Sequence, residues 1–143
     1  MFSLNEKIII ITGGYGYLGR SMVEALLKFG AKVIVFGKNK SKFCDAFSAY
    51  DRVEFIRCDL SNSKNIIEAC EEVIDKYSKI DVLINNAYFV SGEEPLNISD
   101  NDWSLSLDIC LSSIYRICKK VVPYMAKKQE GKILNLLLEI KVN

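Results

Sequence analysis

The fold is decided by one stretch near the start of the chain, Ile8-Ile9-Ile10-Ile11-Thr12-Gly13-Gly14-Tyr15-Gly16-Tyr17-Leu18-Gly19. Its four consecutive isoleucines form a short apolar run, which is typical of a strand covered on both faces. The glycines that follow are spaced GxGxxG from Gly14, or TGxxGxxG from Thr12. A strand that enters such a turn and then a helix directs free N–H groups and the positive helix end toward an anion. The stretch is therefore predicted to hold the diphosphate of a dinucleotide, and a tight turn without a ligand is the alternative.

Each glycine has a role in this prediction. Gly13 and Gly14 permit the tight turn, Gly16 lets the backbone approach phosphate, and Gly19 lets the helix pack on the strand. The turn is expected to supply these cofactor-binding residues: Gly13, Tyr15, Gly16, Tyr17, Leu18 and Gly19.

The rest of the chain alternates strands with helices and contains no repeat or linker. Strands are expected at 7–11, 32–36, 53–57, 81–85 and 132–138, and helices at 18–29, 41–50, 61 or 63 to 77, and 100–128. This alternation implies right-handed crossovers and a parallel sheet with helices on both faces. We predict a doubly wound, Rossmann-like α/β fold with strand order 3-2-1-4-5, as a single domain over residues 1–143.

Apolar spacing predicts which side of each helix faces the sheet. In the first helix the predicted inner residues are Leu18, Met22, Ala25, Leu26 and Phe29, with Gly30 ending the helix. In the helix ending near residue 77 they are Ile66, Ile67, Cys70, Val73, Ile74 and Tyr77, with Ser61 or Ser63 as the cap. Pro123 is expected to bend the last turns of the long helix.

Composition limits the classes of partner. Lys and Arg total 19 and Asp and Glu total 18, so the formal net charge of +1 disfavours nucleic acid, which needs a basic field. No apolar run approaches a bilayer span or a signal-peptide core, so no membrane partner and a cytoplasmic location are expected. The chain has no His, and its cysteines lack metal-ligand spacing, so no metal site is predicted. The thiols are interpreted as small buried hydrophobic groups of a reducing compartment: Cys44, Cys58, Cys70, Cys110 and Cys118.

The end of the second predicted strand bears on cofactor choice. NAD-binding proteins usually place a carboxylate there to bond the ribose 2′-hydroxyl. Here the strand ends Phe36-Gly37-Lys38-Asn39-Lys40, with no carboxylate and with two cations that could neutralise a 2′-phosphate. NADP is therefore predicted and NAD is possible, with a solvated basic turn as the alternative.

Further motifs resemble those of the short-chain dehydrogenase/reductase family, and together with the glycine turn they cover the whole chain. Cys58-Asp59-Leu60 is similar to a motif that contacts adenine, Asn85-Asn86-Ala87-Tyr88 to an NNAG motif, and Gly131-Lys132-Ile133-Leu134-Asn135 to the start of the fifth strand. The resemblance implies that Asp59 and Leu60 flank the adenine and that Asn86 and Ala87 line the nicotinamide side. Tyr88, which stands where the motif has Gly, is also expected to bind the cofactor. Asp59 has an alternative role at a helix start.

The family's catalytic residues do not match this chain. The helix Asn falls at Cys110, the Ser falls at Leu138 or Leu137, and the Tyr-x-x-x-Lys segment would follow Asn143. Tyr115 and Lys119 have that spacing only by chance, inside a helix. No catalytic residue is assigned, and the prediction is the cofactor-binding half of an oxidoreductase acting on a carbonyl or alcohol substrate, inactive alone. A non-enzymatic dinucleotide-binding module, a truncated or frameshifted product without function, and a sugar-nucleotide epimerase are the alternatives.

The resemblance also predicts consequences for stability. Without the family's later strands and catalytic helix, the strand at 132–138 becomes a bare edge, and the domain is incomplete at its C-terminus. An apolar helix face is expected to be uncovered, at Ile109, Ile114, Ile117, Val121 and Val122. Marginal stability follows unless a partner covers it, and a homo-oligomer through the long helix at 101–128 is possible.

Overall fold

Five parallel strands form the centre of the structure, a computed structural model that describes residues 2–93 and 95–136. The strands are β1 (Ile8–Thr12), β2 (Lys32–Gly37), β3 (Val53–Arg57), β4 (Val82–Asn85) and β5 (Lys132–Asn135). They lie in the order β3-β2-β1-β4-β5, with β1 in the middle. The predicted doubly wound topology is confirmed.

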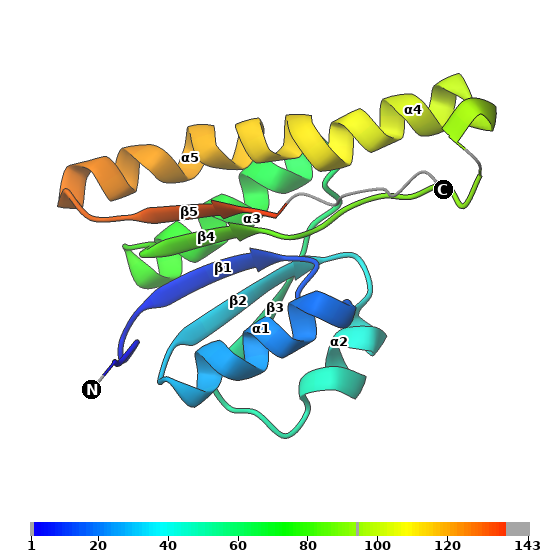
Figure 1. Cartoon of the computed structure of the whole chain (residues 1–143). Coiled ribbons are helices and arrows are strands. Elements are labelled where there is room, and N and C mark those ends of the chain that lie inside the picture. Colours follow the sequence, from blue (N-terminus) through cyan, green and yellow to red (C-terminus); the bar gives the residue numbers. More distant parts are fainter. Residues whose placement is uncertain (1, 94, 137–143) are drawn as a thin grey trace.

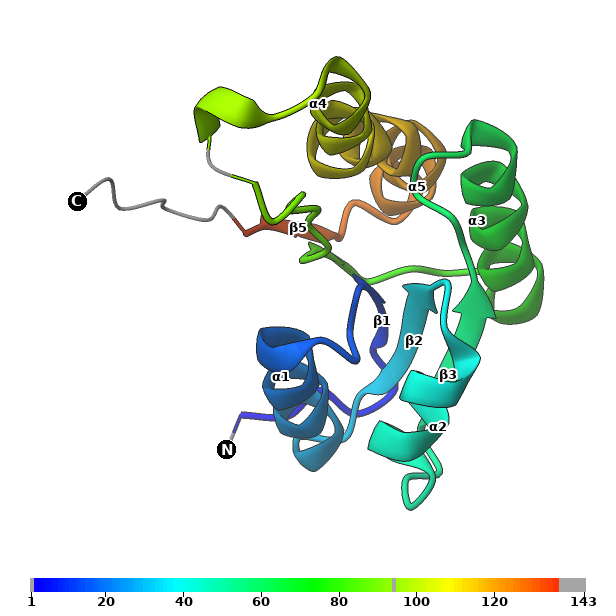
Figure 2. The same cartoon turned by 90° about the vertical axis from the view of Figure 1, so that its right-hand side faces the viewer.

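Helices cover both faces of this sheet (Figure 1, Figure 2). They are α1 (Tyr17–Lys28) and α2 (Lys40–Phe47) on one face, and α3 (Ser63–Tyr77), α4 (Asp100–Leu107) and α5 (Ser113–Lys128) on the other. A short 3-10 turn, η1 (Pro95–Asn97), precedes α4, and a wide π-helical turn, η2 (Asp108–Ser112), joins α4 to α5.

The isoleucines of β1 supply both halves of the core. Ile8 and Ile10 pack among residues of α3 and α5, whereas Ile9 and Ile11 pack among residues of α1 and α2. Successive side chains of a strand point to opposite faces, so an unbroken apolar run is what a central strand requires. All four side chains are buried.

Two helix faces differ from the predicted ones. In α1 the buried residues are Gly19, Val23 and Leu27, while Leu18 and Phe29 are exposed. The glycine of the turn is itself the first buried position, so the apolar stripe starts at residue 19 and not at 18. In α3 the inner side includes Ala69, and the predicted Ile67 is exposed.

The helix ends follow local hydrogen-bond chemistry. Gly30 follows α1 with φ of +97°, in the predicted position. The cap of α3 is Asn62, not Ser61 or Ser63, because its side-chain oxygen accepts from the N–H of Lys64 and Asn65. Ser99 caps α4 by accepting from the N–H of Asp102.

The predicted long helix is continuous from α4 to α5, with its irregular turn at Asp108–Ser112 and Pro123 inside α5. The predicted uncovered face is partly wrong, because Ile117 and Val121 are fully buried against the core beside α3. Val122 is exposed as expected, and the other large exposed apolar residues of this helix are Trp103, Leu107, Leu111, Tyr115 and Tyr124. Association of two copies through this surface stays a prediction.

Strand β5 lies at one edge of the described sheet, and all four of its residues are exposed. The part of the predicted strand at 137–138 lies outside the described residues. Of the cysteines, Cys58 and Cys70 are buried as expected, Cys44 is exposed, and Cys110 and Cys118 are half-buried. Among the described helices, none is long and apolar enough to cross a membrane.

One ion-pair cluster ties α3 and β2 to the edge strand β3. The Glu54 carboxylate lies 2.7 Å from Lys32 Nζ and 2.8 Å from Lys76 Nζ. Partial burial works to raise the pKa of Glu54, but the hydrogen bonds from the two lysines outweigh it and lower that pKa from 4.5 to about 2.

We expect Glu54→Gln to lower the free energy of unfolding at pH 7 by about 1–2 kcal/mol, a figure reduced for solvent screening. Because the folded-state pKa is depressed, this contribution is complete above pH 4.5 and is lost as the pH falls toward about 2. Urea unfolding at pH 7, 5, 4 and 3 measures the difference. Glu68→Gln, which removes an exposed 3.7 Å pair with Lys64, is the control. A difference in the free energy of unfolding between the wild type and Glu54→Gln that is the same at every pH would contradict this role of the Glu54 ion pairs.

Candidate dinucleotide-binding site

The candidate site lies along the carboxyl edge of the sheet. Because the strands are parallel and β1 stands between β2 and β4, the segments that follow these three strands emerge side by side. Open α/β sheets bind their ligands at this edge. The glycine turn follows β1, Lys38 follows β2, and Asn86 follows β4.

The turn after β1 is held by backbone hydrogen bonds. Gly13 has φ of +65°, its N–H donates to the carbonyl of Phe36, and its own carbonyl accepts from the N–H of Gly16. A positive φ favours glycine, so this position explains the residue type.

Gly19 is the point of closest packing. A Cβ placed on it would lie 2.5 Å from the Gly13 carbonyl oxygen and 2.8 Å from Asn86 Nδ2. Gly14 is also enclosed, since its Cβ would contact side chains of Ile11, Val23 and Val35 at 3.0–3.1 Å. These two glycines bring helix, strand and turn together, as the sequence predicted for Gly19.

The end of β4 is fastened to the turn through Thr12 and Asn86. The Thr12 hydroxyl accepts from the backbone N–H of Asn86 at 3.1 Å and of Ala87 at 3.0 Å. The Asn86 side-chain amide donates to the carbonyls of Thr12 and Gly13. Thr12 is 2 % exposed and Asn86 9 % exposed. Asn86 and Ala87 therefore lie against the glycine turn, while the neighbouring Tyr88 is exposed.

Helix α1 begins without a capping side chain. Gly16 is its N-cap residue and offers no side-chain acceptor, and the first turn of α1 contains no acidic residue. The first N–H groups of a helix need a partner from outside it, and an anion meets that need. Gly16, Tyr17 and Leu18 are exposed here, so a ligand can reach this helix start.

The end of β2 brings Lys38 close to Asp59. Lys38 Nζ lies 3.8 Å from the Asp59 carboxylate, and the two side chains are 63 % and 35 % exposed. Partial burial works to raise the pKa of Asp59, but hydrogen bonds from the Ser61 hydroxyl and N–H, with the charge of Lys38, hold that pKa below its ordinary value. Asp59 thus also has its alternative role, because it binds Ser61 in the segment that leads into α3. The N-cap residue of α3 is nevertheless Asn62.

Tyr15 links the two parts of the site. Its ring lies against Gly37 and its hydroxyl contacts the turn after β2. Leu60, the last predicted adenine contact, is 7 % exposed and belongs to the core beneath this edge.

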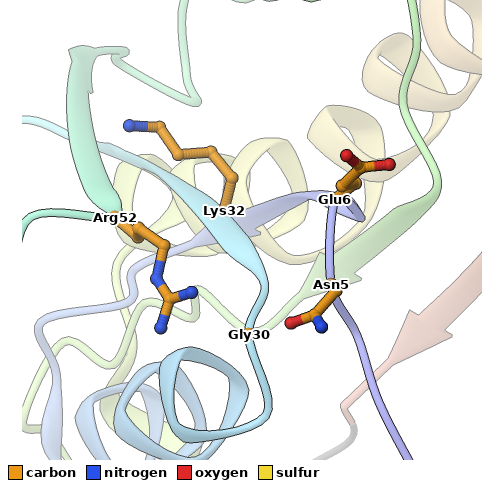
Figure 3. Close-up of a pocket in the computed structure, with 5 residues that line it drawn as sticks. All are labelled: Asn5, Glu6, Gly30, Lys32 and Arg52. Atoms are coloured by element: carbon orange, nitrogen blue, oxygen red, sulfur yellow. The ribbon is translucent and has the colours of Figure 1, made fainter.

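A hollow lies at the opposite edge of the sheet. It is lined by Asn5, Glu6, Gly30, Lys32 and Arg52. Figure 3 shows that the charged ends of Glu6, Lys32 and Arg52 point apart. Lys32 pairs with Glu54, and Arg52 donates to the carbonyl of Leu27. These charges serve the fold and do not converge on a common point.

The positions that differ from the family's catalytic residues are Cys110, Leu137 and Leu138. Cys110 lies in the π-helical turn η2, where its sulfur accepts from the N–H of Phe89 at 3.5 Å. Leu137 and Leu138 lie outside the described residues. Within 2–93 and 95–136, no three His, Cys, Asp or Glu side chains gather in a way that could hold a metal ion.

Sequence reasoning missed two elements of the site. The hydrogen bonds that the Thr12 hydroxyl accepts were not predicted. A polar residue directly after four isoleucines at the end of a buried strand is the signal that could have indicated them. The approach of the Tyr15 ring to Gly37 joins residues far apart in sequence and left no local signal.

The fold and these contacts define a Rossmann-like domain with its glycine turn at the carboxyl edge of the sheet. Residues 7–137 match the sequence profile of the family described as short chain dehydrogenase. The chain belongs to this short-chain dehydrogenase/reductase family, whose members are oxidoreductases that bind NAD or NADP.

Individual relatives agree with this assignment. The chain is 30 % identical over 138 residues to 3-oxoacyl-(acyl-carrier-protein) reductase FabG of Chlamydia pneumoniae, covering 94 % of this chain and 56 % of that protein. The crystal structure of L-sorbose reductase from Gluconobacter frateurii, complexed with NADPH and L-sorbose, matches with a TM-score of 0.83 at 22 % identity. A metagenomic short-chain oxidoreductase in complex with NADP matches with a TM-score of 0.82 at 23 % identity. The two matches cover 92 % of this chain and 52 % and 61 % of the others. The chain thus spans about half the length of the curated relatives it matches.

We expect Thr12→Val to lower the free energy of unfolding by about 2–3 kcal/mol, because two N–H groups at this edge lose their acceptor. Thr12→Ser keeps the oxygen and loses only a methyl group, so a cost of about 1 kcal/mol or less is expected. Urea unfolding of the three proteins measures the difference. Equal losses for Val and Ser would show that the methyl group, and not the hydroxyl, stabilises this junction.

Proposed function

We propose that this chain binds NADP(H) at the carboxyl edge of its sheet and is the cofactor-binding half of an oxidoreductase that transfers hydride between the nicotinamide and a carbonyl or alcohol substrate. The observation that carries the proposal is the uncapped start of α1 beside the Gly13–Gly19 turn. Its free N–H groups lie at the edge of the sheet where an anionic diphosphate is stabilised best.

The residues fit this cofactor. Glycines keep side chains out of the turn, so the backbone of Gly13, Gly16 and the first turn of α1 would hold the diphosphate. In this proposal Asp59 would meet the adenine, and Asn86 and Ala87 would line the nicotinamide side. Bound nicotinamide supplies or accepts the hydride. What the chain's own residues contribute is binding and orientation.

Preference for NADP rests on the charge at the end of β2. The turn Gly37-Lys38-Asn39-Lys40 offers cations and no carboxylate. The pair between Lys38 and Asp59 is long and exposed, so it is worth little and leaves Lys38 available. The NADPH and NADP complexes of the two structural neighbours are consistent with this preference.

We also propose that the chain alone does not turn over a substrate. Cys110 stands where the family has the Asn of its proton relay, and Leu137 and Leu138 stand where it has Ser. These departures from the family pattern also favour a second function as much as the first, namely a cytoplasmic dinucleotide-binding module without catalysis. Both functions require the same bound cofactor, so binding does not separate them, whereas substrate-dependent turnover by this chain would favour the enzyme.

We expect Gly16→Asp to weaken NADPH binding at least tenfold relative to Gly16→Asn, measured by NADPH fluorescence or calorimetry. Either residue is a good N-cap, and a Cβ at position 16 would meet only the Gly13 carbonyl oxygen, at 3.3 Å. The two variants are nearly the same size, so the added charge is their main difference. Aspartate at a helix start stabilises the fold, so weaker binding with an unchanged melting temperature isolates repulsion of the diphosphate. Equal binding by the two variants would place the ligand elsewhere, and no binding by the wild type would end the proposal.

Turnover is expected to be absent in the same samples. NADPH at saturating concentration should be oxidised no faster with the chain and a panel of ketones and aldehydes than with the substrate alone. Thr12→Val serves as a matched sample with a disturbed site, so that trace contamination is recognised. A substrate-dependent rate that Gly16→Asp abolishes would overturn the proposed inactivity and favour the enzyme.

A further inference from the structure

The side chain of Tyr15 reaches from the glycine turn to the end of β2. Its hydroxyl oxygen accepts hydrogen bonds from the backbone N–H of Lys38 at 3.0 Å and of Asn39 at 3.1 Å. These N–H groups directly follow β2, where dinucleotide-binding sheets hold the 2′ position of the adenosine ribose. The Tyr15 hydroxyl therefore stands at that position.

The absence of a side chain at Gly37 makes this placement possible. A Cβ on Gly37 would lie 2.5–2.8 Å from ring atoms of Tyr15, including its hydroxyl oxygen. Gly37 is the last residue of β2 and pairs in register with Arg57 of β3. The ring therefore rests on the end of β2, with its hydroxyl at the N–H groups of Lys38 and Asn39.

Both acceptor positions of the hydroxyl are used by the two N–H groups, so its own proton is what it can offer to a ligand. Donation by two N–H groups polarises the O–H bond and strengthens it as a donor. A phenol in this arrangement favours a ligand group rich in acceptor oxygens.

Two of the three neighbouring side-chain acceptors are already engaged. Asn39 Oδ1 accepts from the N–H of Lys42, and Asp59 Oδ1 accepts from both donors of Ser61, while Asp59 Oδ2 faces Lys38 Nζ at 3.8 Å. A ribose 2′-hydroxyl needs an acceptor for its proton, whereas a 2′-phosphate needs donors and a cation. The Tyr15 hydroxyl supplies a donor and Lys38 supplies the cation, so the site suits a 2′-phosphate.

We propose that Tyr15 is a specificity-determining residue. Its hydroxyl accepts from two N–H groups of the turn after β2 and donates its own hydrogen bond to the 2′-phosphate of NADP(H). This inference rests on the proposed function and assigns its discrimination between NADP(H) and NAD(H) to one side chain.

The test is titration of the wild type and Tyr15→Phe with NADPH and with NADH, followed by fluorescence. Tyr15→Phe is expected to weaken NADPH binding about tenfold, the loss of one hydrogen bond to a charged group, and NADH binding less than threefold. Tyr50→Phe is the matched control, since Tyr50 lies near the opposite edge of the sheet, packed on Phe47. It is expected to change neither affinity.

Gly37→Ala is the second variant, because it keeps the hydroxyl but displaces the ring. It is expected to reduce the preference for NADPH in the same direction, with circular dichroism and thermal unfolding reporting the fold. Equal losses for both cofactors in Tyr15→Phe, or tighter NADPH binding, would overturn the inference, the latter by showing that the hydroxyl blocks the phosphate. If the wild type binds neither cofactor, the proposed function fails. If the wild type binds both and Tyr15→Phe is unchanged, only the inference fails.

Discussion

The close contact between Gly19 and the carbonyl of Gly13 is the constraint on which the rest of the site depends. It brings the start of α1 onto the end of β1, and the same carbonyl accepts from Gly16 and from the Asn86 side chain. One oxygen thus joins the turn, the helix and the neighbouring strand β4. Any side chain at residue 19 would separate all three. The N–H groups at the start of α1 are consequently oriented by the packing of the fold.

The two ends of the site are built differently. Toward β4, buried hydrogen bonds of Thr12 and Asn86 fix the backbone, so this end is rigid and little exposed. Toward β2, the groups are exposed: Lys38, Asp59 and the Tyr15 hydroxyl are held by long or solvent-facing contacts. Exposed contacts of this kind contribute little to folding, so they are free to differ among proteins of one architecture. If the proposed function holds, cofactor choice is made at the end of the site where a change costs the fold least.

Sequence reasoning recovered the strand order, the glycine turn and the family, because the period of apolar residues and the spacing of glycines are local signals. It failed where a tertiary contact decides. Val23 and Leu27 face the sheet because Gly19 sets the rotation of α1, and Ile117 is buried because α3 packs beside it. Asn62 caps α3 in competition with two serines of similar propensity. The Tyr15 contact with Gly37 links residues 22 positions apart and depends on the order in which strands lie, which no local pattern encodes.

The central place of β1 has a consequence for how the chain acquires its structure. Strand β1 needs β2 on one side and β4 on the other, and the Ile8 N–H donates to the carboxylate of Asp81, 73 residues further along the chain. Until β4 is in place, one edge of this apolar strand has unpaired backbone N–H and C=O groups. Pairings of such long sequence separation form slowly. The segment that defines the centre of the sheet is thus exposed to wrong pairing while the chain folds.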